Sequence, residues 1–244
     1  MKHAKRHPLI FGTIILTATG LITRVIGFFY RIYLSRLFGE EGMGIYQLLS
    51  PALSLSFSLT AAGYQTAISK YVAADSAKRP SGNLKPLLAG ISITLPLSLV
   101  TNAILFFSAD PIGIFLLKDH RTVPMLRILS FSVPFAALHA CINGYFYGKK
   151  KASVPALTQL LEQLARVSCV FLVTGADLAE GRTPSINAAV LGLTVGEIFS
   201  MLIALVCLYI HLYPDSSILS LQNICPSVPV YRDLLGMALP LTAN

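Results

Sequence analysis

Two arginines lie inside the first long apolar run of the sequence, where a charged side chain is costly. Arg24 and Arg31 are seven residues apart, so on one helix they share a face and lie about 10 Å apart along its axis. A charge at the centre of a membrane span costs roughly 2.5–3.5 kcal/mol on insertion scales. Arg24 is too far into the run to reach its N-terminal surface, so we expect it to face a polar cavity. Arg31 lies nearer the far end, where a guanidinium can extend into the membrane interface.

A stripe of polar side chains follows in a later apolar run. Gln159, Glu162, Gln163 and Arg166 have the spacing that places side chains on one face of a helix. Glu162 and Arg166 stand in the i,i+4 order that favours an internal ion pair. The stripe therefore either anchors its helix to a neighbour through a self-neutralising pair, or lines the same cavity as Arg24.

Glu197 lies near the middle of the last long apolar run before residue 213. A lone carboxylate at this depth indicates either a proton or ion site, or a partner for an arginine on another helix. Arg24 is one possible partner. His139, also within an apolar run, is expected to join helices through hydrogen bonds, with a proton relay as the alternative.

Sequence motifs of enzymes and metal sites are absent. The cysteines form no CxxC pair and the histidines no HExxH pattern, so the cysteines are interpreted as small packing residues. No Walker loop or GxSxG motif is present, and the loops are too short for the catalytic loop of a membrane glycosyltransferase. We therefore expect no enzyme activity, no cofactor and no metal.

The composition is that of an integral membrane protein. Apolar residues make up 54% of the chain and charged residues 12%, against about 25% charged in a typical soluble domain. The net charge of +8 comes mostly from basic residues in short loops. It therefore indicates membrane topology and contact with membrane lipids, and not nucleic-acid binding.

The apolar runs predict an all-α bundle of six transmembrane helices, followed by the start of a seventh in residues 231–244. Each run approaches or exceeds the roughly 20 residues that a membrane span needs. A cleaved signal peptide is disfavoured for the first run, since it continues past Arg24 without a small-residue cleavage site. The predicted spans are 9–34, 44–73, 87–109, 123–147, 153–174 and 187–212.

Basic residues outside these spans are distributed unequally between the two sides of the membrane. The richer side places the N-terminus and the turn Lys149–Lys151 in the cytoplasm. That side carries Lys2, Lys5, Arg6, Lys78, Arg79, Lys85, Lys149, Lys150, Lys151 and Arg232, whereas the other carries Arg36, Lys118, Arg121 and Arg182.

Three stretches of the sequence resemble a known family. They are GLITRVIGFFYRIYLSRLFGEEGMGIYQ (20–47), AGYQTAISKYVA (62–73) and GYFYGKKKASVPALTQLLEQLARV (144–167). All three are similar to the stage V sporulation protein B group of polysaccharide-biosynthesis membrane proteins. This group is part of the multidrug/oligosaccharidyl-lipid/polysaccharide exporter superfamily, which includes lipid II flippases. The last stretch is the most specific, because a basic turn, a proline and the polar stripe occur together.

The resemblance implies two six-helix lobes around a central cavity. Residues 1–230 would form the first lobe and residues 231–244 the beginning of the second, so the chain is expected to be a fragment that needs a second lobe. It also implies a flippase or exporter of lipid-linked oligosaccharide in the bacterial cytoplasmic membrane, with a link to spore cortex formation. In the lipid II flippase relatives, arginines of the first span face the cavity and are thought to engage the substrate's pyrophosphate. The matching residues are Arg24 and, less surely, Arg31.

Two other functions remain open at the level of the sequence. One is a cation-coupled multidrug or small-molecule antiporter of the same superfamily. That function would require intramembrane carboxylates to dominate, whereas here Arg24 accompanies Glu162 and Glu197, with Arg166 between them in the chain. The other is a scaffold for cell-wall assembly that transports nothing. Glu162, Arg166 and Glu197 are in either case the candidates for lining the cavity or coupling an ion.

Overall fold

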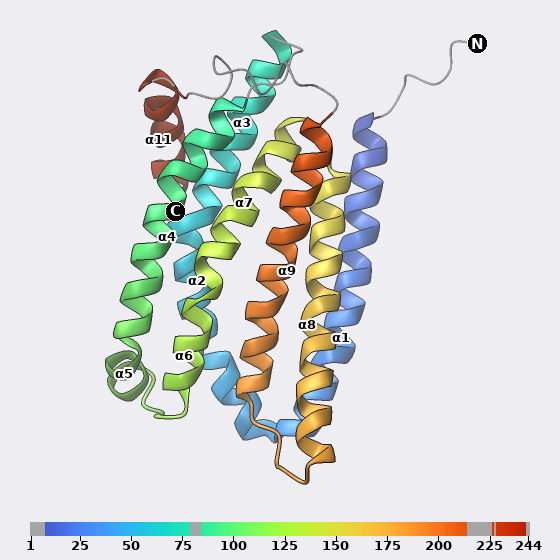
Figure 1. Cartoon of the computed structure of the whole chain (residues 1–244), viewed down its shortest axis with the longest axis vertical. Helices are drawn as coiled ribbons and strands as arrows, with labels where there is room; N and C mark the ends of the chain where they lie inside the picture. Colours follow the sequence, from blue (N-terminus) through green and yellow to red (C-terminus); the bar gives the residue numbers. More distant parts are fainter. Residues whose placement is uncertain (1–7, 79–83, 214–225, 227, 243–244) are drawn as a thin grey trace, which may run out of the picture.

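The computed structural model describes residues 8–78, 84–213, 226 and 228–242 (Figure 1), and these residues contain helices but no strand. The long helices run side by side along the longest axis of the molecule. The basic residues Lys2, Lys5, Arg6 and Arg79, and Cys225, lie outside the described residues. The helices are α1 (Pro8–Leu48), α2 (Ser50–Phe57), η1 (Ser58–Ala62), α3 (Gly63–Lys78), α4 (Lys85–Phe107), α5 (Ala109–Pro111), η2 (Ile112–Leu116), α6 (Thr122–Ser130), α7 (Ser132–Gly148), α8 (Ser153–Ala179), α9 (Asn187–Leu212) and α11 (Val228–Thr242).

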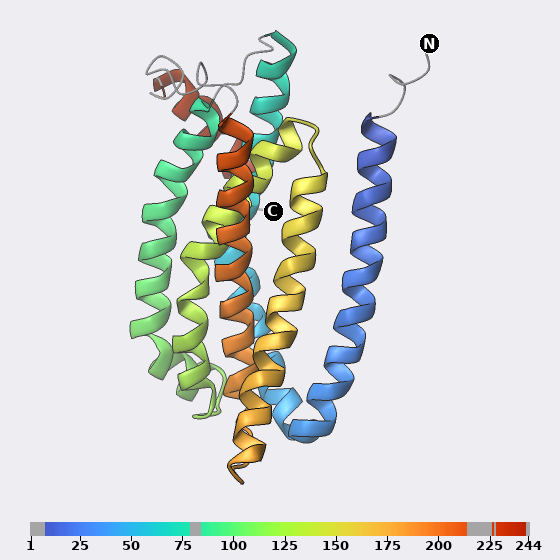
Figure 2. The ribbon, with the colours of Figure 1, turned by 45° about the vertical axis from the view of Figure 1, so that its right-hand side comes forward.

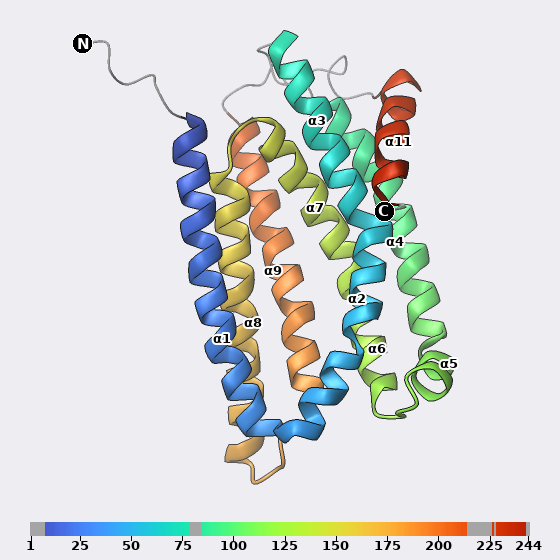
Figure 3. The same ribbon diagram turned by 180° about the vertical axis from the view of Figure 1, so that it is seen from behind.

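Helix α1 reverses direction near its end, and this reversal separates the first two spans. Gly39 has φ 68° and ψ −175°, a backbone conformation that only glycine adopts without strain. After this turn, α2, η1 and α3 run back along the bundle (Figure 3). The turn lies inside the segment 35–43 between the first two predicted spans.

The number of membrane passes agrees with the prediction. Within the described residues, five helical stretches are long and apolar enough to cross a membrane. The first of them contains the reversal at Gly39, so the five stretches make six passes. The all-α six-helix bundle is therefore confirmed. The five stretches are Gly12–Ser76, Lys85–Phe107, Thr122–Gly148, Ser153–Ala179 and Asn187–Leu212.

Helix α7 lies at the centre of the bundle, and glycines allow its neighbours to approach closely. Its Tyr145 and Phe146 are almost fully buried. A Cβ atom at Gly144 would lie 2.6 Å from the carbonyl oxygen of Gln65 on α3. At Gly196 on α9, the same atom would lie 3.2 Å from the carbonyl oxygen of Glu162. Such small-residue contacts are typical of packed membrane helices, and here they bring α3, α7, α8 and α9 together (Figure 2).

The return pass contains one irregular turn. Between α2 and α3, residues Ser58–Ala62 form a π-helical turn, in which the backbone accommodates one extra residue. Thr60 is buried there and its hydroxyl donates to the carbonyl oxygen of Ser56, at 2.7 Å. The turn is thus stabilised locally within the membrane pass.

Helix α11 packs against the first helices of the bundle. Val230, Leu234 and Ala238 are buried in one apolar cluster with Ile68 of α3 and Leu87 of α4. The hydroxyl groups of Tyr231 and Ser92 are hydrogen-bonded at 3.0 Å. The assignment of residues 231–244 to a second domain stays a prediction.

Candidate functional site

A polar cavity lies inside the bundle between the second, fourth, fifth and sixth passes. Its volume is about 300 Å³. At its inner wall, three titratable side chains meet: His139 of α7, Glu162 of α8 and Glu197 of α9. One ring nitrogen of the histidine and one carboxylate oxygen of each glutamate all lie within 4.8 Å of one another. The cavity is lined by Phe57, Gln65, His139, Ala140, Asn143, Tyr147, Pro155, Gln159, Glu162 and Glu197.

The predicted ion pair on α8 is present. Arg166 Nη2 donates to Glu162 Oε1 at 2.5 Å, and Arg166 Nη1 donates to Gln163 Oε1 at 3.5 Å. Both partners of the pair are largely buried, with exposed side-chain fractions of 20% for Arg166 and 17% for Glu162. Glu162 and Gln159 also line the cavity. The stripe therefore both neutralises itself and forms a cavity wall.

His139 joins three helices, as the sequence predicted. Its Nε2 atom lies 2.7 Å from Asn143 Nδ2, 2.9 Å from Ser200 Oγ and 3.2 Å from Thr158 Oγ1. An amide nitrogen only donates hydrogen bonds, so Nε2 is an acceptor and the proton of the neutral ring is on Nδ1. That atom lies 3.7 Å from Glu197 Oε2.

Glu197 contacts a histidine and not an arginine. Among the described residues, the His139 ring is its one neighbour within 4 Å that can carry a positive charge, and the two form an ion pair only when that ring is protonated; no hydrogen bond to the Glu197 carboxylate is present there. The exposed fraction of the Glu197 side chain is 23%. The sequence left open a proton or ion site and a pair with an arginine such as Arg24. The pair between Glu197 and Arg24 is not formed.

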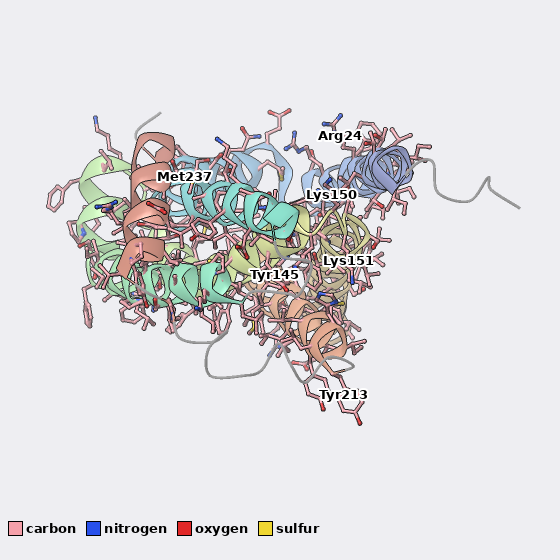
Figure 4. All side chains as sticks on the ribbon, turned by 90° about the horizontal axis from the view of Figure 1, so that it is seen from above. Arg24, Tyr145, Lys150, Lys151, Tyr213 and Met237 are labelled. Atoms are coloured by element: carbon pink, nitrogen blue, oxygen red, sulfur yellow. The ribbon has the colours of Figure 1, made fainter. Side chains whose placement is uncertain are left out.

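The two arginines of α1 are exposed and lie apart from this cluster. Arg24 points outward from α1 in Figure 4, away from the packed helices. Neither Arg24 nor Arg31 lines the polar cavity. Arg31 instead borders a second cavity of about 530 Å³, together with Tyr46 and Gln47. Within the described residues, neither arginine forms an ion pair.

Several residues of the cluster were missed in the sequence. Asn143 lies four residues after His139 on α7, and Ser200 lies three residues after Glu197 on α9. Both spacings place the second residue on the same helix face as the first, so this signal was available. Thr158 likewise lies four residues before Glu162 on α8, whereas Gln65 carries no such signal, since its neighbours in the cluster come from other helices.

Comparisons with known proteins agree with this architecture. Residues 9–242 match the polysaccharide biosynthesis protein family. The chain is 34% identical to stage V sporulation protein B of Bacillus subtilis (strain 168), over 96% of the chain and 45% of that protein. It is 27% identical to the lipid II flippase MurJ of the same organism, over 70% of the chain and 32% of that protein. The chain thus spans less than half the length of these relatives.

Solved structures show the same fold at low sequence identity. An outward-facing multidrug resistance MATE transporter of the MOP superfamily matches with a TM-score of 0.76 and 16% identity, over 95% of this chain and 52% of that one. A MOP superfamily transporter from Pyrococcus furiosus matches with a TM-score of 0.73 and 17% identity, over 97% and 51%. These similarities concern the fold alone.

Proposed function

The chain belongs to the polysaccharide biosynthesis protein family, and on this premise we propose that its protein moves a lipid-linked oligosaccharide across the bacterial cytoplasmic membrane. The cargo would be a peptidoglycan or polysaccharide precursor on a polyisoprenyl pyrophosphate carrier. Similarity to a lipid II flippase and to a sporulation protein supports this class of cargo and a role in spore cortex formation. The protein acts as a transporter and not as an enzyme.

The observation that carries the proposal is the exposure of two arginines, Arg24 and Arg31, that form no ion pair within the described residues. Both guanidinium groups are exposed on α1 and lack an ion-pair partner among the described residues. A permanent charge without a partner is costly inside a membrane, so its retention favours a ligand or a second protein surface, with the membrane interface as the alternative for Arg31. A guanidinium can bind a phosphate through two parallel hydrogen bonds. Arg24 and Arg31 would thus hold the pyrophosphate.

The exposed face of α1 would line a central cavity closed by a second six-helix lobe. The similar solved structures are about twice as long as the matched part, since this chain covers 52% and 51% of them. In this arrangement, residues 1–230 form the first lobe and residues 231–244 lead into the second. The transported lipid would then pass between the lobes.

A second candidate function is cation-coupled antiport of drugs or other small molecules. The cluster of His139, Glu162 and Glu197 favours it, because buried titratable groups suit ion coupling. However, a cationic drug would be repelled by Arg24 and Arg31 on the exposed face. Lipid-linked glycan is therefore the preferred cargo.

Reconstitution of the whole protein would separate the two functions. In liposomes, we expect it to carry a polyprenyl-pyrophosphate-linked glycan to the opposite leaflet, measured as glycan that becomes accessible to an added glycosidase. Protein-free liposomes and a fluorescent cationic drug serve as controls. Movement of the drug without movement of the glycan would contradict the proposal.

The orientation of the bundle is also a proposal, with the N-terminus and Lys149–Lys151 in the cytoplasm. The end of α3, the start of α4 and the α7–α8 connection lie at the same end as the start of α1, and the α8–α9 connection lies at the opposite end (Figure 1). Lys78, Lys85 and the three lysines of 149–151 thus gather at one end, as the positive-inside rule expects.

Lys150 is the best position at which to test this orientation. It is exposed, whereas Lys149 is partly buried over the Tyr145 ring and Lys151 is hydrogen-bonded to His211 (Figure 4). Burial lowers the pKa of Lys149, with Asp75 opposing the effect. In intact cells expressing an otherwise cysteine-free protein, an impermeant thiol reagent should label Arg182→Cys and not Lys150→Cys. The reverse pattern would show that the orientation is wrong.

A further inference from the structure

The polar cluster contains one negative charge more than its arginine can balance. Glu162 is paired with Arg166, and this pair is neutral. Glu197 has only His139 as a partner, at 3.7 Å, and accepts no hydrogen bond within the described part of the chain. An ionised carboxylate with neither a counter-ion nor a hydrogen bond is strongly disfavoured away from water. Glu197 is largely buried and reaches solvent only through the polar cavity, so the site favours one additional positive charge beside it.

The helices packed around the cluster bring few charged groups to it. The charged groups that act on Glu162 are Glu197, Arg166 and His139. From the return pass, the cavity receives the neutral side chains of Phe57 and Gln65, whereas the exposed Lys70 borders only an adjoining pocket. Tyr30 of the first pass and Tyr46, which follows the reversal at Gly39, lie near Arg166 but are neutral phenols. None of the described residues that line the polar cavity brings a permanent positive charge to Glu197, so a bound cation is the natural source of the balancing charge.

The chemistry of the cluster selects among the possible ions. A divalent metal would leave a net positive charge, and it would sit beside the guanidinium of Arg166. A sodium ion prefers oxygen ligands, and the imidazole nitrogen of His139 is a poor ligand for such a hard cation. A proton restores neutrality with a single charge. It can reside on the Glu197 carboxyl or on the His139 ring, whose Nδ1 atom faces that carboxyl.

We propose that His139 and Glu197 form a proton-binding site, with the Glu162–Arg166 pair as its fixed neutral neighbour. The ring is oriented by Asn143, Thr158 and Ser200, so that Nδ1 faces Glu197. The cavity gives water and protons access to the carboxylate. Proton binding as such does not depend on the proposed function, whereas its role as the coupling ion rests on that function.

Proton exchange would act on the packing of the helices. His139 is on α7 and Glu197 is on α9, and these helices are in contact. Loss of the proton leaves an unbalanced charge between the two helices, and its return removes that charge. The site thus links the protonation state to the force between two passes that form the cavity wall.

Infrared difference spectroscopy on the whole protein in lipid would test the proposal. Between about pH 6 and pH 9, a range in which carboxyl groups with ordinary pKa values stay ionised, we expect the C=O band of one protonated carboxylic acid to disappear, or one imidazolium signal to disappear in its place. Glu197→Gln should remove this change, and acid–base titration over the same range should count one proton fewer per chain. Glu40→Gln, at an exposed position in the turn after the first span, should leave the buried signal unchanged. His139→Gln provides an independent variant if Glu197→Gln does not fold, and it should shift the midpoint by at least one pH unit.

Three outcomes would overturn the proposal. The first is an unchanged proton count in both Glu197→Gln and His139→Gln. The second is displacement of the proton signal by millimolar sodium chloride at constant pH, against a choline chloride control. The third is stoichiometric retention of zinc by the wild-type protein and not by Glu197→Gln. Arg24→Ala should keep the proton signal even if it loses glycan transport, so failure of the two proposals can be distinguished.

Discussion

Replacing Arg24 with alanine is expected to lower transport of lipid-linked glycan by roughly 10- to 100-fold while the protein remains folded. Hydrogen bonds to charged groups contribute about 1.5–3 kcal/mol, and each 1.4 kcal/mol corresponds to a factor of ten. Arg24 is exposed and has no ion-pair partner among the described residues, so its removal strands no buried charge. Initial transport rates in liposomes, normalised to folded protein, would give the result.

If Arg24 contacts pyrophosphate, different substitutions at this position should lower transport to different degrees. Arg24→Lys should recover transport only partly, because an ammonium keeps the charge but lacks the planar pair of donors. Arg182→Ala, in the connection after α8, is a matched control and should transport normally. Neutralising Glu162 or Glu197 should not rescue Arg24→Ala, since these carboxylates contact Arg166 and His139. Wild-type transport by either double variant would exclude the binding role of Arg24.

The second large effect is expected at Arg166. Arg166→Met should destabilise the protein by about 3–5 kcal/mol, because it leaves the buried carboxylate of Glu162 without its partner. The loss should appear as a lower unfolding temperature in detergent and a smaller yield of monodisperse protein. The polar cavity beside Glu162 offers little compensation, since the unpaired Glu197 lies within 4.8 Å.

A double variant separates the lost pair from lost packing. Glu162→Gln combined with Arg166→Met removes both charges at similar side-chain volume, and it should recover most of the stability. Gln163→Leu is the matched control, because its single contact with Arg166 is long at 3.5 Å. If the double variant is as unstable as Arg166→Met alone, then the pair does not account for the stability of this region.

The sequence was most informative where the deciding interactions are local. The length of the apolar runs sets the passes, and the i,i+4 order of Glu162 and Arg166 predicts their pair, which the structure contains. The reversal at Gly39 falls in the segment 35–43, which the predicted spans 9–34 and 44–73 leave between them. Each of these features depends on residues close in the chain.

Contacts between distant helices could not be derived in this way. His139 and Glu197 are separated by two helical connections, and their approach depends on how α7, α8 and α9 pack. Small residues such as Gly196 set this packing, but their sequence positions do not specify which helices they join. The sequence therefore left Arg24 as a partner for Glu197, whereas the fold places Arg24 on an outer face.

The π-helical turn at Ser58–Ala62 has a consequence for the register of the second pass. Phe57 and Gln65 lie on either side of this turn, and both line the polar cavity. In a regular α-helix, residues eight apart are rotated by about 80° relative to each other. One extra residue in the wide turn reduces this rotation to about 20°, so the two side chains share one direction. The π-helical turn thus accommodates one extra residue in the membrane helix. The side chains of α3, which follows the turn, therefore keep the same face toward the cavity as those of α2.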